Sequence, residues 1–509
     1  MSLPLTVPTV LEQLARSEPD RTAILAPGRR PLSRIRLLEA TRRIAGGLKA
    51  RGVRAGDRVA VVLPGGPELA VTYLGVASAA VFAPLNPAYT AGEFEFYLSD
   101  LRPATLIVEA NSDSAAVAVA RRLGVPVLRV RPLPDEPAGV VAFDDDAPAP
   151  DGSAGRPDPD SVALVLHTSG TTSRPKVVPL THRNLCRSAH NIRHSLRLGP
   201  DDRSLVVMPL FHIHALVSAT LAPLASGGSF VTPPAFHATE YLDWLEEFRP
   251  TWYTCSPTIH QSMLTRARQD LSRIAGHSLR FIRTGAAAMP PRLHQELEET
   301  FGVPVIEFLG MTEAAQQITS NHLPPGKRKI GSVGRPAGPE VAIMDASGDL
   351  LPPGEQGEIV IRGDNVTLGY ADNPEANASA FRNGWFRTGD QGCFDEEGFL
   401  YVTGRLKEMI NRGGEKVWPR EVDEALLEHP AVYHAVTFGI PHAQLGEEVG
   451  AAVVLRDGAR ATETEIRQHV AARLASFKTP RVVVFVGAIP KGPTGKLQRI
   501  GLAEALGIR

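Results

Sequence analysis

The chain has 509 residues, a formal net charge of -1, 43% hydrophobic residues and 21% charged residues. This composition is typical of a globular chain of roughly two to four domains, and the balanced charge excludes the basic excess by which proteins hold nucleic acid. The three cysteines lack CxxC spacing, which argues against a disulfide framework or a zinc site and favours the cytoplasm. No apolar run approaches the roughly 18 residues of a membrane span, and the N-terminus has no signal-peptide pattern.

Short apolar runs alternate with helical patterns as far as about residue 310, which predicts an α/β fold with largely parallel strands. Strands are expected at 57–63, 106–108, 125–128, 162–166, 205–208, 229–231, 252–254, 279–284 and 305–308. Helices are expected at 68–82, 238–248 and 291–300. The stretch 132–159 is rich in Pro, Asp, Ala and Gly, and it is expected to be an exposed connection.

The pattern changes from about Gly331, where short strands alternate with glycine-rich turns and indicate an antiparallel β subdomain. The strands are expected at 340–344, 357–362 and 399–402. After Gly404, helices at 421–428 and 462–474 and strands at 432–438 and 451–454 predict a small α+β domain. The expected organisation is an N-terminal domain, 1–404, of two α/β subdomains plus a β subdomain, and a C-terminal domain, 405–509.

A loop dense in hydroxyls follows the strand at 162–166 and ends in a cation. Its residues are Thr168, Ser169, Gly170, Thr171, Thr172, Ser173, Arg174, Pro175 and Lys176. Hydroxyl and backbone donors with a lysine are suited to polyphosphate, although the Walker A spacing is missing. By composition alone, such a cluster is more often an ordinary loop.

The string TSGTTSRPK resembles the phosphate loop of the ANL superfamily of adenylate-forming enzymes, and the further motifs below extend the resemblance to AMP-forming acyl-CoA synthetases over nearly the whole chain. The resemblance implies the ANL fold, with a mobile C-terminal domain. It assigns ATP binding to Thr168, Ser169, Gly170, Thr171, Thr172 and Lys176, with Thr172 also catalytic. Val177 departs from the family, which has glycine after the lysine.

Two motifs before residue 320 match the family. In MPLFHIH the resemblance makes His212 a gate beside the carboxylate and places His214 in the acyl pocket; two histidines alone also suggest a metal, but a packed pair is favoured. In LGMTE it makes Glu313 the catalytic Mg²⁺ ligand, a role that suits a carboxylate. The same motif supplies nucleotide contacts from Leu309, Gly310, Met311 and Thr312, although its last two residues alone read as a helix cap.

Four motifs after residue 380 complete the resemblance. WFRTGD makes Asp390 the acceptor for the ribose hydroxyls, and TGRLKE makes Arg405 a nucleotide contact and Lys407 the hinge. NRGGEK places Gly413 and Gly414 along the coenzyme A tunnel, where glycine lets the backbone approach a thin ligand. PKGPTGK makes Lys496 the catalytic lysine of adenylation.

The acyl pocket is expected to include His214, Gly285, Ala286, Ala287 and Gln316, and the closest resemblance is to the oxalyl-CoA synthetase group. These positions offer no hydroxyl after Thr284 and no cation. Because a buried carboxylate without a partner is very unfavourable, the pattern predicts a bulky, mainly apolar monocarboxylic acid.

The predicted function is ATP-dependent activation of a carboxylic acid to an acyl adenylate with pyrophosphate release, then transfer to coenzyme A. The implied cofactors are ATP, Mg²⁺ and coenzyme A. Val177 and Trp418 leave open an adenylation-only enzyme that passes acyl-AMP to a partner. A non-catalytic adenylate sensor and a homodimer also remain open, whereas the absence of a GxSxG motif disfavours a serine hydrolase.

Overall fold

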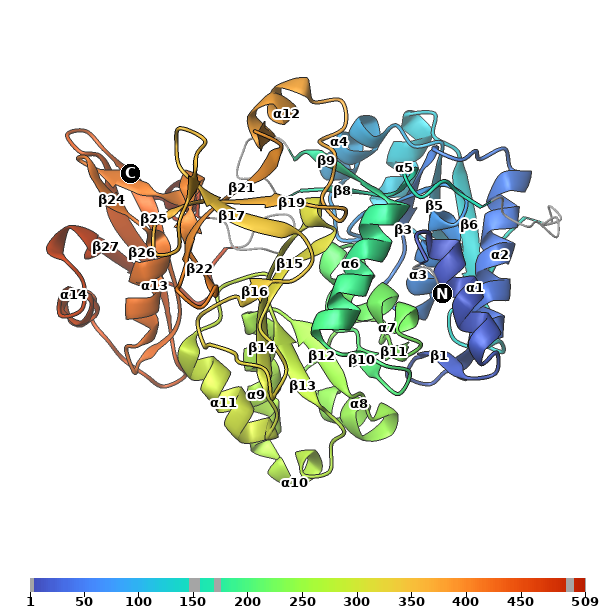
Figure 1. Cartoon of the computed structure of the whole chain (residues 1–509), viewed down its shortest axis with the longest axis horizontal. Helices are drawn as coiled ribbons and strands as arrows, with labels where there is room; N and C mark the ends of the chain where they lie inside the picture. Colours follow the sequence, from blue (N-terminus) through green and yellow to red (C-terminus); the bar gives the residue numbers. More distant parts are fainter. Residues whose placement is uncertain (1–3, 146–155, 169–174, 491–498, 509) are drawn as a thin grey trace. The chain divides into compact units, whose positions relative to one another are not determined.

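The computed structural model describes residues 4–145, 156–168, 175–490 and 499–508 (Figure 1). The chain forms two compact units. The first contains Met1–Thr168, Lys176–Glu340 and Arg362–Ala380, and the second contains Val341–Ile361 and Phe381–Arg509. The domain boundary expected at 404/405 stays a prediction.

One sheet of the first unit has seven strands in the order β7-β6-β5-β3-β4-β8-β9. They are β3 (Arg58–Val62), β4 (Val81–Pro84), β5 (Thr105–Glu109), β6 (Val127–Pro132), β7 (Val141–Phe143), β8 (Val162–His167) and β9 (Val177–Thr181). The central strands are parallel, and β7 and β9 are antiparallel edges. Alternate residues such as Ala60 and Val62 pack against α4 (Ala91–Leu101) and α5 (Ala115–Arg122), as the two-residue period of a strand requires.

Two elements of this sheet differ from the sequence prediction. The helix expected at 68–82 is α3 (Pro67–Ala77), and its expected end belongs to β4, where Phe82 pairs with Val59 of β3. Sheet pairing therefore overrides the helix propensity of the alanines nearby. The connection expected at 132–159 contains β7, which pairs with β6 through Val141 and Pro132.

The other sheet of the first unit has nine strands in the order β16-β15-β14-β13-β12-β10-β11-β1-β2. They are β1 (Thr22–Leu25), β2 (Leu32–Ser33), β10 (Arg203–Leu205), β11 (Ser229–Val231), β12 (Trp252–Cys255), β13 (Phe281–Thr284), β14 (Val305–Met311), β15 (Gln316–Ser320) and β16 (Arg335–Pro336). The strands from β1 and β11 through β14 are parallel, and β15 returns antiparallel to β14.

The two faces of the nine-stranded sheet differ in what covers them. On one face, Tyr253, Ile282 and Val305 join the core formed with α8 (Tyr241–Phe248), α9 (Pro257–Gln269) and α11 (Pro291–Phe301). The intervening residues face the π-helix η1 (His214–Leu221), where Thr254 meets His214. Other helices of this unit are α6 (His182–Ser195), α7 (Ala222–Ala225), α10 (Leu271–Ile274) and α12 (Pro374–Ala380).

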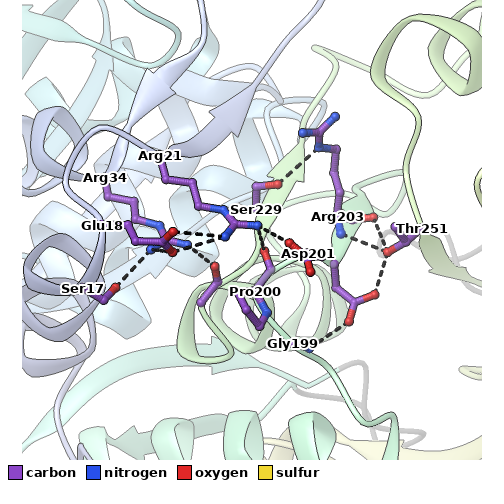
Figure 2. Close-up of polar contacts among 12 residues, drawn as sticks. Ser17, Glu18, Arg21, Arg34, Gly199, Pro200, Asp201, Arg203, Ser229 and Thr251 are labelled. Carbon is purple, nitrogen blue, oxygen red and sulfur yellow. Dashed lines mark hydrogen bonds and ion pairs between the residues drawn. The ribbon is translucent and has the colours of Figure 1, made fainter.

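A charged network joins the helices α1 (Val7–Ser17) and α2 (Arg34–Ala50) to the nine-stranded sheet (Figure 2). The carboxylate of Glu18 lies between the guanidinium groups of Arg21 and Arg34, at 3.2 Å and 3.0 Å. Arg21 also reaches Asp201, at 2.6 Å, on the approach to β10. The buried side chain of Arg34 therefore has an acidic partner within the chain.

The second unit contains two sheets. In the first, the order is β18-β17-β19-β21-β20, and β22 pairs with β21. These strands are β17 (Glu340–Met344), β18 (Leu350–Leu351), β19 (Gly357–Arg362), β20 (Phe381–Arg382), β21 (Trp385–Phe394) and β22 (Leu400–Arg405). Each pairing among β17–β18, β19–β21, β20–β21 and β21–β22 is antiparallel, as predicted.

The other sheet of this unit has the order β24-β23-β26-β25, and β27 pairs with β26. Its strands are β23 (Ile410–Arg412), β24 (Glu415–Val417), β25 (Val432–His442), β26 (Gly446–Leu455) and β27 (Val482–Phe485). The helices α13 (Pro419–Leu427) and α14 (Glu463–Ala471) bury Leu426 and Ile466 in one core with this sheet. The architecture confirms the predicted fold class.

No helix within the described ranges is both long enough and apolar enough to cross a membrane.

Candidate active site

The phosphate loop begins and ends on adjacent strands of the seven-stranded sheet. Strand β8 leads into Thr168 and strand β9 follows Lys176, and the Thr168 N–H donates to the Lys176 carbonyl oxygen at 2.9 Å. This hydrogen bond closes the neck of the loop. The predicted residues Ser169, Gly170, Thr171 and Thr172 lie outside the described residues.

A cation, an aromatic ring and a carboxylate meet beside this neck. Glu313 is only 6% exposed, and its Oε1 accepts a hydrogen bond from the Tyr370 hydroxyl at 2.9 Å. The Lys176 Nζ lies 4.4 Å from the centroid of the Tyr370 ring, a distance at which a cation is attracted to an aromatic face. Burial, followed by the neighbouring Glu313, raises the pKa of Tyr370, so its hydroxyl keeps its proton and donates.

This cluster fits a magnesium–nucleotide complex. Mg²⁺ takes oxygen ligands and is often held by one or two carboxylates together with substrate phosphates. Glu313 supplies such a carboxylate, and within the part of the chain that the structure describes no group of three or more His, Cys, Asp or Glu gathers as a metal cage. The nearby Lys176 adds the positive charge that phosphate oxygens require.

Tyr370 was not among the sequence predictions. The tyrosine is 57 residues from Glu313 in the chain, and only the folded arrangement brings the two side chains together. The backbone supports the same contact, because the Thr367 N–H donates to the Glu313 carbonyl oxygen at 2.7 Å.

The predicted nucleotide residues before Glu313 occupy the end of β14 and the short helix η2 (Thr312–Ala314). At Gly310, an added Cβ would lie 2.1 Å from the Gln316 carbonyl oxygen, so this position accepts only glycine without a shift of the backbone. Leu309 donates its N–H to the Thr319 hydroxyl at 3.3 Å. Met311 and Thr312 complete the turn from β14 into η2.

The predicted acyl-pocket residues lie where η1 meets the ends of β13 and β14. The His214 Nε2 lies 2.7 Å from the Thr254 Oγ1, and its ring stands edge-on to Phe308 with the centroids 5.2 Å apart. A Cβ at Gly285 would lie 2.4 Å from the Phe308 ring, so glycine lets this ring lie against the strand. The gate candidate His212 precedes η1, and its carbonyl oxygen accepts from the N–H of Leu216.

Two residues at the same place have backbone angles that favour glycine. Ala286 and Gln316 have φ angles of 68° and 105°, in the region that favours glycine. Such conformations are unfavourable for other residues and cluster at functional sites. Ala287 follows Ala286 directly on this loop and is exposed.

A cavity of about 340 Å³ lies beside the histidine motif in the first unit. Its lining is mainly apolar and includes Met208, Phe211, Pro234, Phe236 and Ile259. Gly65 and Gly66 contribute backbone to the same cavity. The cavity therefore offers apolar surface next to the gate candidate.

Arg283 is a second residue that sequence reasoning missed. It is fully buried on β13, and its guanidinium lies 3.6 Å from the centroid of the Phe308 ring. It donates to the Ser218 hydroxyl and to the Gln317 Oε1, each at 2.7 Å. The sequence signal was a lone arginine in an apolar strand run, Phe281-Ile282-Arg283.

In the second unit, the predicted ribose residues are paired. The Arg405 Nε donates to the Asp390 Oδ1 at 2.8 Å, across neighbouring positions of β21 and β22. Asp390 is 6% exposed, and the Arg405 side chain is 49% exposed. A carboxylate fixed in this way keeps acceptor capacity for hydroxyl donors.

The hinge and tunnel candidates lie nearby in the chain. Lys407 is exposed on the short helix η3 (Leu406–Glu408). Gly413 and Gly414 form the turn between β23 and β24 with φ angles of 60° and 97°, which requires glycine or an equally tolerant residue. The Trp418 ring packs over Gly404, since a Cβ there would lie 2.6 Å from it. The predicted catalytic Lys496 lies outside the described residues.

The two buried cysteines, Cys186 and Cys255, do not offer a nucleophile. Burial raises the pKa of the Cys186 thiol to about 12 and that of Cys255 well above its usual value. Thiolates at neutral pH are therefore excluded at both positions.

Known families and proteins match this chain along most of its length. Residues 11–371 match the family described as AMP-binding enzyme, and residues 421–496 match the AMP-binding enzyme C-terminal domain. The chain is 44% identical to a probable CoA ligase, CCL9, of Humulus lupulus, over 98% of the chain and 96% of the relative. It is 42% identical to an oxalate–CoA ligase of Arabidopsis thaliana, over 98% of each. ATP-bound MatB from Rhodopseudomonas palustris superposes with a TM-score of 0.89 at 32% identity, covering 98% of both chains.

Proposed function

Because this chain belongs to the AMP-binding enzyme family, with matches to the main model and to its C-terminal domain, we propose which of its residues carry the two half-reactions of an acyl-CoA ligase. The enzyme uses ATP with Mg²⁺ to convert a carboxylic acid into an acyl adenylate and pyrophosphate. It then transfers the acyl group to the thiol of coenzyme A. A carboxylate alone is a poor acyl donor, since its leaving group is an oxide.

The cluster of Lys176, Tyr370 and Glu313 is the observation that supports the proposed first half-reaction, adenylation of the acid. The bond between the α- and β-phosphates breaks as a carboxylate oxygen attacks the α-phosphorus, and the two reacting anions repel each other. Bound Mg²⁺ supplies charge neutralisation at the phosphates. Glu313 is the protein ligand for that cation, and Tyr370 fixes the orientation of its carboxylate. Lys176 stabilises the negative charge of the polyphosphate.

The remaining adenylation roles are assigned by the family motifs. Thr168, Ser169, Gly170, Thr171 and Thr172 bind phosphate, and Lys496 contacts the reacting carboxylate and α-phosphate. His212 gates the carboxylate.

Asp390 accepts the ribose hydroxyls, and its ion pair with Arg405 supports this role, because the pair orients the carboxylate before nucleotide binds. Leu309, Gly310, Met311 and Thr312 bind the nucleotide, with Leu309 against adenine and Thr312 at the α-phosphate. The close packing of Gly310 on Gln316 supports the position of this segment.

The second half-reaction depends on the turn at Gly413 and Gly414. Both residues have positive φ, and a Cβ at Gly414 would meet no atom within 4 Å, so one side of the turn is open. This open backbone is suited to the narrow pantetheine chain. Lys407 is the hinge of the C-terminal domain movement that brings the turn to the acyl adenylate. The thiol sulfur attacks the acyl carbon, the acyl–phosphate bond breaks, and AMP leaves.

The experiment is a screen of carboxylic acids for pyrophosphate release by the purified protein, with and without coenzyme A. Mass spectrometry of the products then distinguishes acyl adenylate from acyl-CoA. We expect acyl-CoA only when coenzyme A is present. Accumulation of acyl adenylate in the presence of coenzyme A would instead support the adenylation-only alternative, in which a partner enzyme accepts the acyl group. Absence of pyrophosphate release with every acid would contradict the proposed function.

A cytoplasmic location accords with the three cysteines, all of which are free thiols. A homodimer is the remaining proposal from the family resemblance, and sedimentation of the purified protein tests it.

A further inference from the structure

Arg283 is a buried cation, and it has no acidic partner among the residues that the structure describes. Its side chain is fully buried, and among the described residues its hydrogen-bond acceptors are the neutral Ser218 hydroxyl and Gln317 amide oxygen. Its Nε has no acceptor within the same ranges. Burial lowers the pKa of Arg283 to about 9, so the guanidinium still carries its charge at neutral pH. An uncompensated charge in the interior is strongly unfavourable.

The strand register places this cation on the face of the sheet that carries the acyl pocket. Arg283 lies opposite Thr254 on β12, and Thr254 contacts the pocket residue His214. The pocket position Gly285 follows the last residue of β13, and the Phe308 ring that contacts the Arg283 guanidinium also lies against Gly285. The acceptor Ser218 belongs to η1, the same helix as His214.

Phe308 contacts both Arg283 and residues of the predicted acyl pocket. Its ring contacts the Arg283 guanidinium, stands edge-on to the His214 ring, and lies against Gly285. The next strand contributes a further polar group, because the Gln316 amide is 2% exposed and both its nitrogen and its oxygen lack a hydrogen-bond partner among the described residues. Two buried polar groups, the Arg283 guanidinium and the Gln316 amide, therefore lie beside residues of the predicted acyl pocket.

We propose that Arg283 binds a second anionic group on the substrate, so that the enzyme activates acids carrying a carboxylate or sulfonate besides the reacting carboxylate. This inference rests on the proposed function and replaces the apolar acid expected from the sequence. That expectation depended on the absence of a second cation near the pocket, and Arg283 contacts Phe308, which packs on the pocket residues His214 and Gly285. A guanidinium suits either anion, because its planar array of N–H donors can form two parallel hydrogen bonds.

The experiment compares matched acids in the pyrophosphate-release assay. Oxalate, malonate, succinate and sulfoacetate are the dianionic acids, and acetate, propionate, butyrate and benzoate are the monoanionic acids. We expect kcat/KM of the natural protein to be at least about tenfold higher for the best dianionic acid than for any monoanionic one. In Arg283→Met, that ratio should fall at least about tenfold, mainly through KM of the dianionic acid.

A second variant, Gln317→Glu, tests the proposal independently if Arg283→Met does not fold. Gln317→Glu keeps the size of the side chain and offers Arg283 a carboxylate within the chain. It should retain the fold and lose the preference for dianionic acids, because the cation is then occupied. Arg34→Met is the matched control, since Arg34 is equally buried but pairs with Glu18 in a different region of the first unit. Its selectivity ratio should equal that of the natural protein.

Three outcomes distinguish failure of this inference from failure of the proposed function. Strong activity with benzoate or butyrate, and little with the dianionic acids, overturns the role of Arg283 and leaves the ligase assignment intact. Unchanged selectivity in folded Arg283→Met or Gln317→Glu also overturns it. Absence of pyrophosphate release with every acid contradicts the proposed function itself.

Discussion

Two buried arginines of the first unit have different electrostatic surroundings. Arg34 donates to Ser17 and Glu18, each at 3.0 Å, and to the Gly227 carbonyl oxygen, within the network shown in Figure 2. Arg283 is just as deeply buried, yet its acceptors are neutral and a ring lies against its guanidinium. The chain thus places an anion beside the first charge and leaves the second without an anion among the residues described.

The difference between the two arginines indicates which buried charged residues are candidates for a functional role. A cation that is paired within the chain contributes to stability, and its removal should change folding more than chemistry. A cation or carboxylate with neutral partners is preorganised for a charged ligand, and its removal should change chemistry more than folding. The Glu313 carboxylate accepts a hydrogen bond from the neutral Tyr370 hydroxyl, and its proposed role is to bind Mg²⁺.

The largest expected effect is at Lys496, whose proposed partners are the substrate carboxylate and phosphate. Lys496→Ala should lower the rate of adenylation at least about 100-fold, the scale seen when one charge-stabilising group is removed from an active site. The melting temperature should not change, because the proposed partners of this lysine belong to the substrate. Pyrophosphate exchange and a thermal melt measure the two quantities. Near-full adenylation by the variant would show that the assignment is wrong.

A smaller effect is expected when the carboxylate of Glu313 loses its hydrogen bond. Tyr370→Phe keeps the ring beside Lys176 and removes only the hydroxyl. The variant should need a higher Mg²⁺ concentration for half-maximal rate and lose roughly tenfold in kcat/KM, since supporting residues of metal ligands typically contribute 10–100-fold. Calorimetric titration of ATP at several Mg²⁺ concentrations should show the same shift without turnover.

Tyr73→Phe is the matched control for Tyr370→Phe. The Tyr73 hydroxyl is fully buried and has no hydrogen-bond partner among the described residues. Its removal should leave the Mg²⁺ dependence unchanged. Equal behaviour of the two variants would mean that the hydroxyl of Tyr370 has no special role toward Glu313.

The sequence predicted the fold well because apolar periodicity is a local pattern. The roles given to the motif residues stay predictions. Apolar runs bounded by glycine predict the strands β3, β8 and β13. The spacing of apolar residues within a run distinguishes a strand from a helix. The sequence did not predict Tyr370 or Arg283, since each acquires its role from contacts between distant segments: Tyr370 with Glu313, and Arg283 with Ser218. The strand β7 was missed for a similar reason, because its pairing with β6 outweighs the composition of the surrounding connection.

The smallest effect on activity is expected from Arg34→Met. This variant removes the buried arginine that is paired with an acid within the chain. The variant loses three hydrogen bonds, which contribute about 0.5–1.5 kcal/mol each. The remaining Glu18 carboxylate is 52% exposed and keeps Arg21 as a partner, so its desolvation adds little. Urea denaturation should therefore show a decrease of about 2 kcal/mol in the unfolding free energy, while kcat/KM changes less than about twofold. A variant of unchanged stability with impaired adenylation would contradict this prediction. It would mean that Arg34, although paired within the chain, contributes to catalysis.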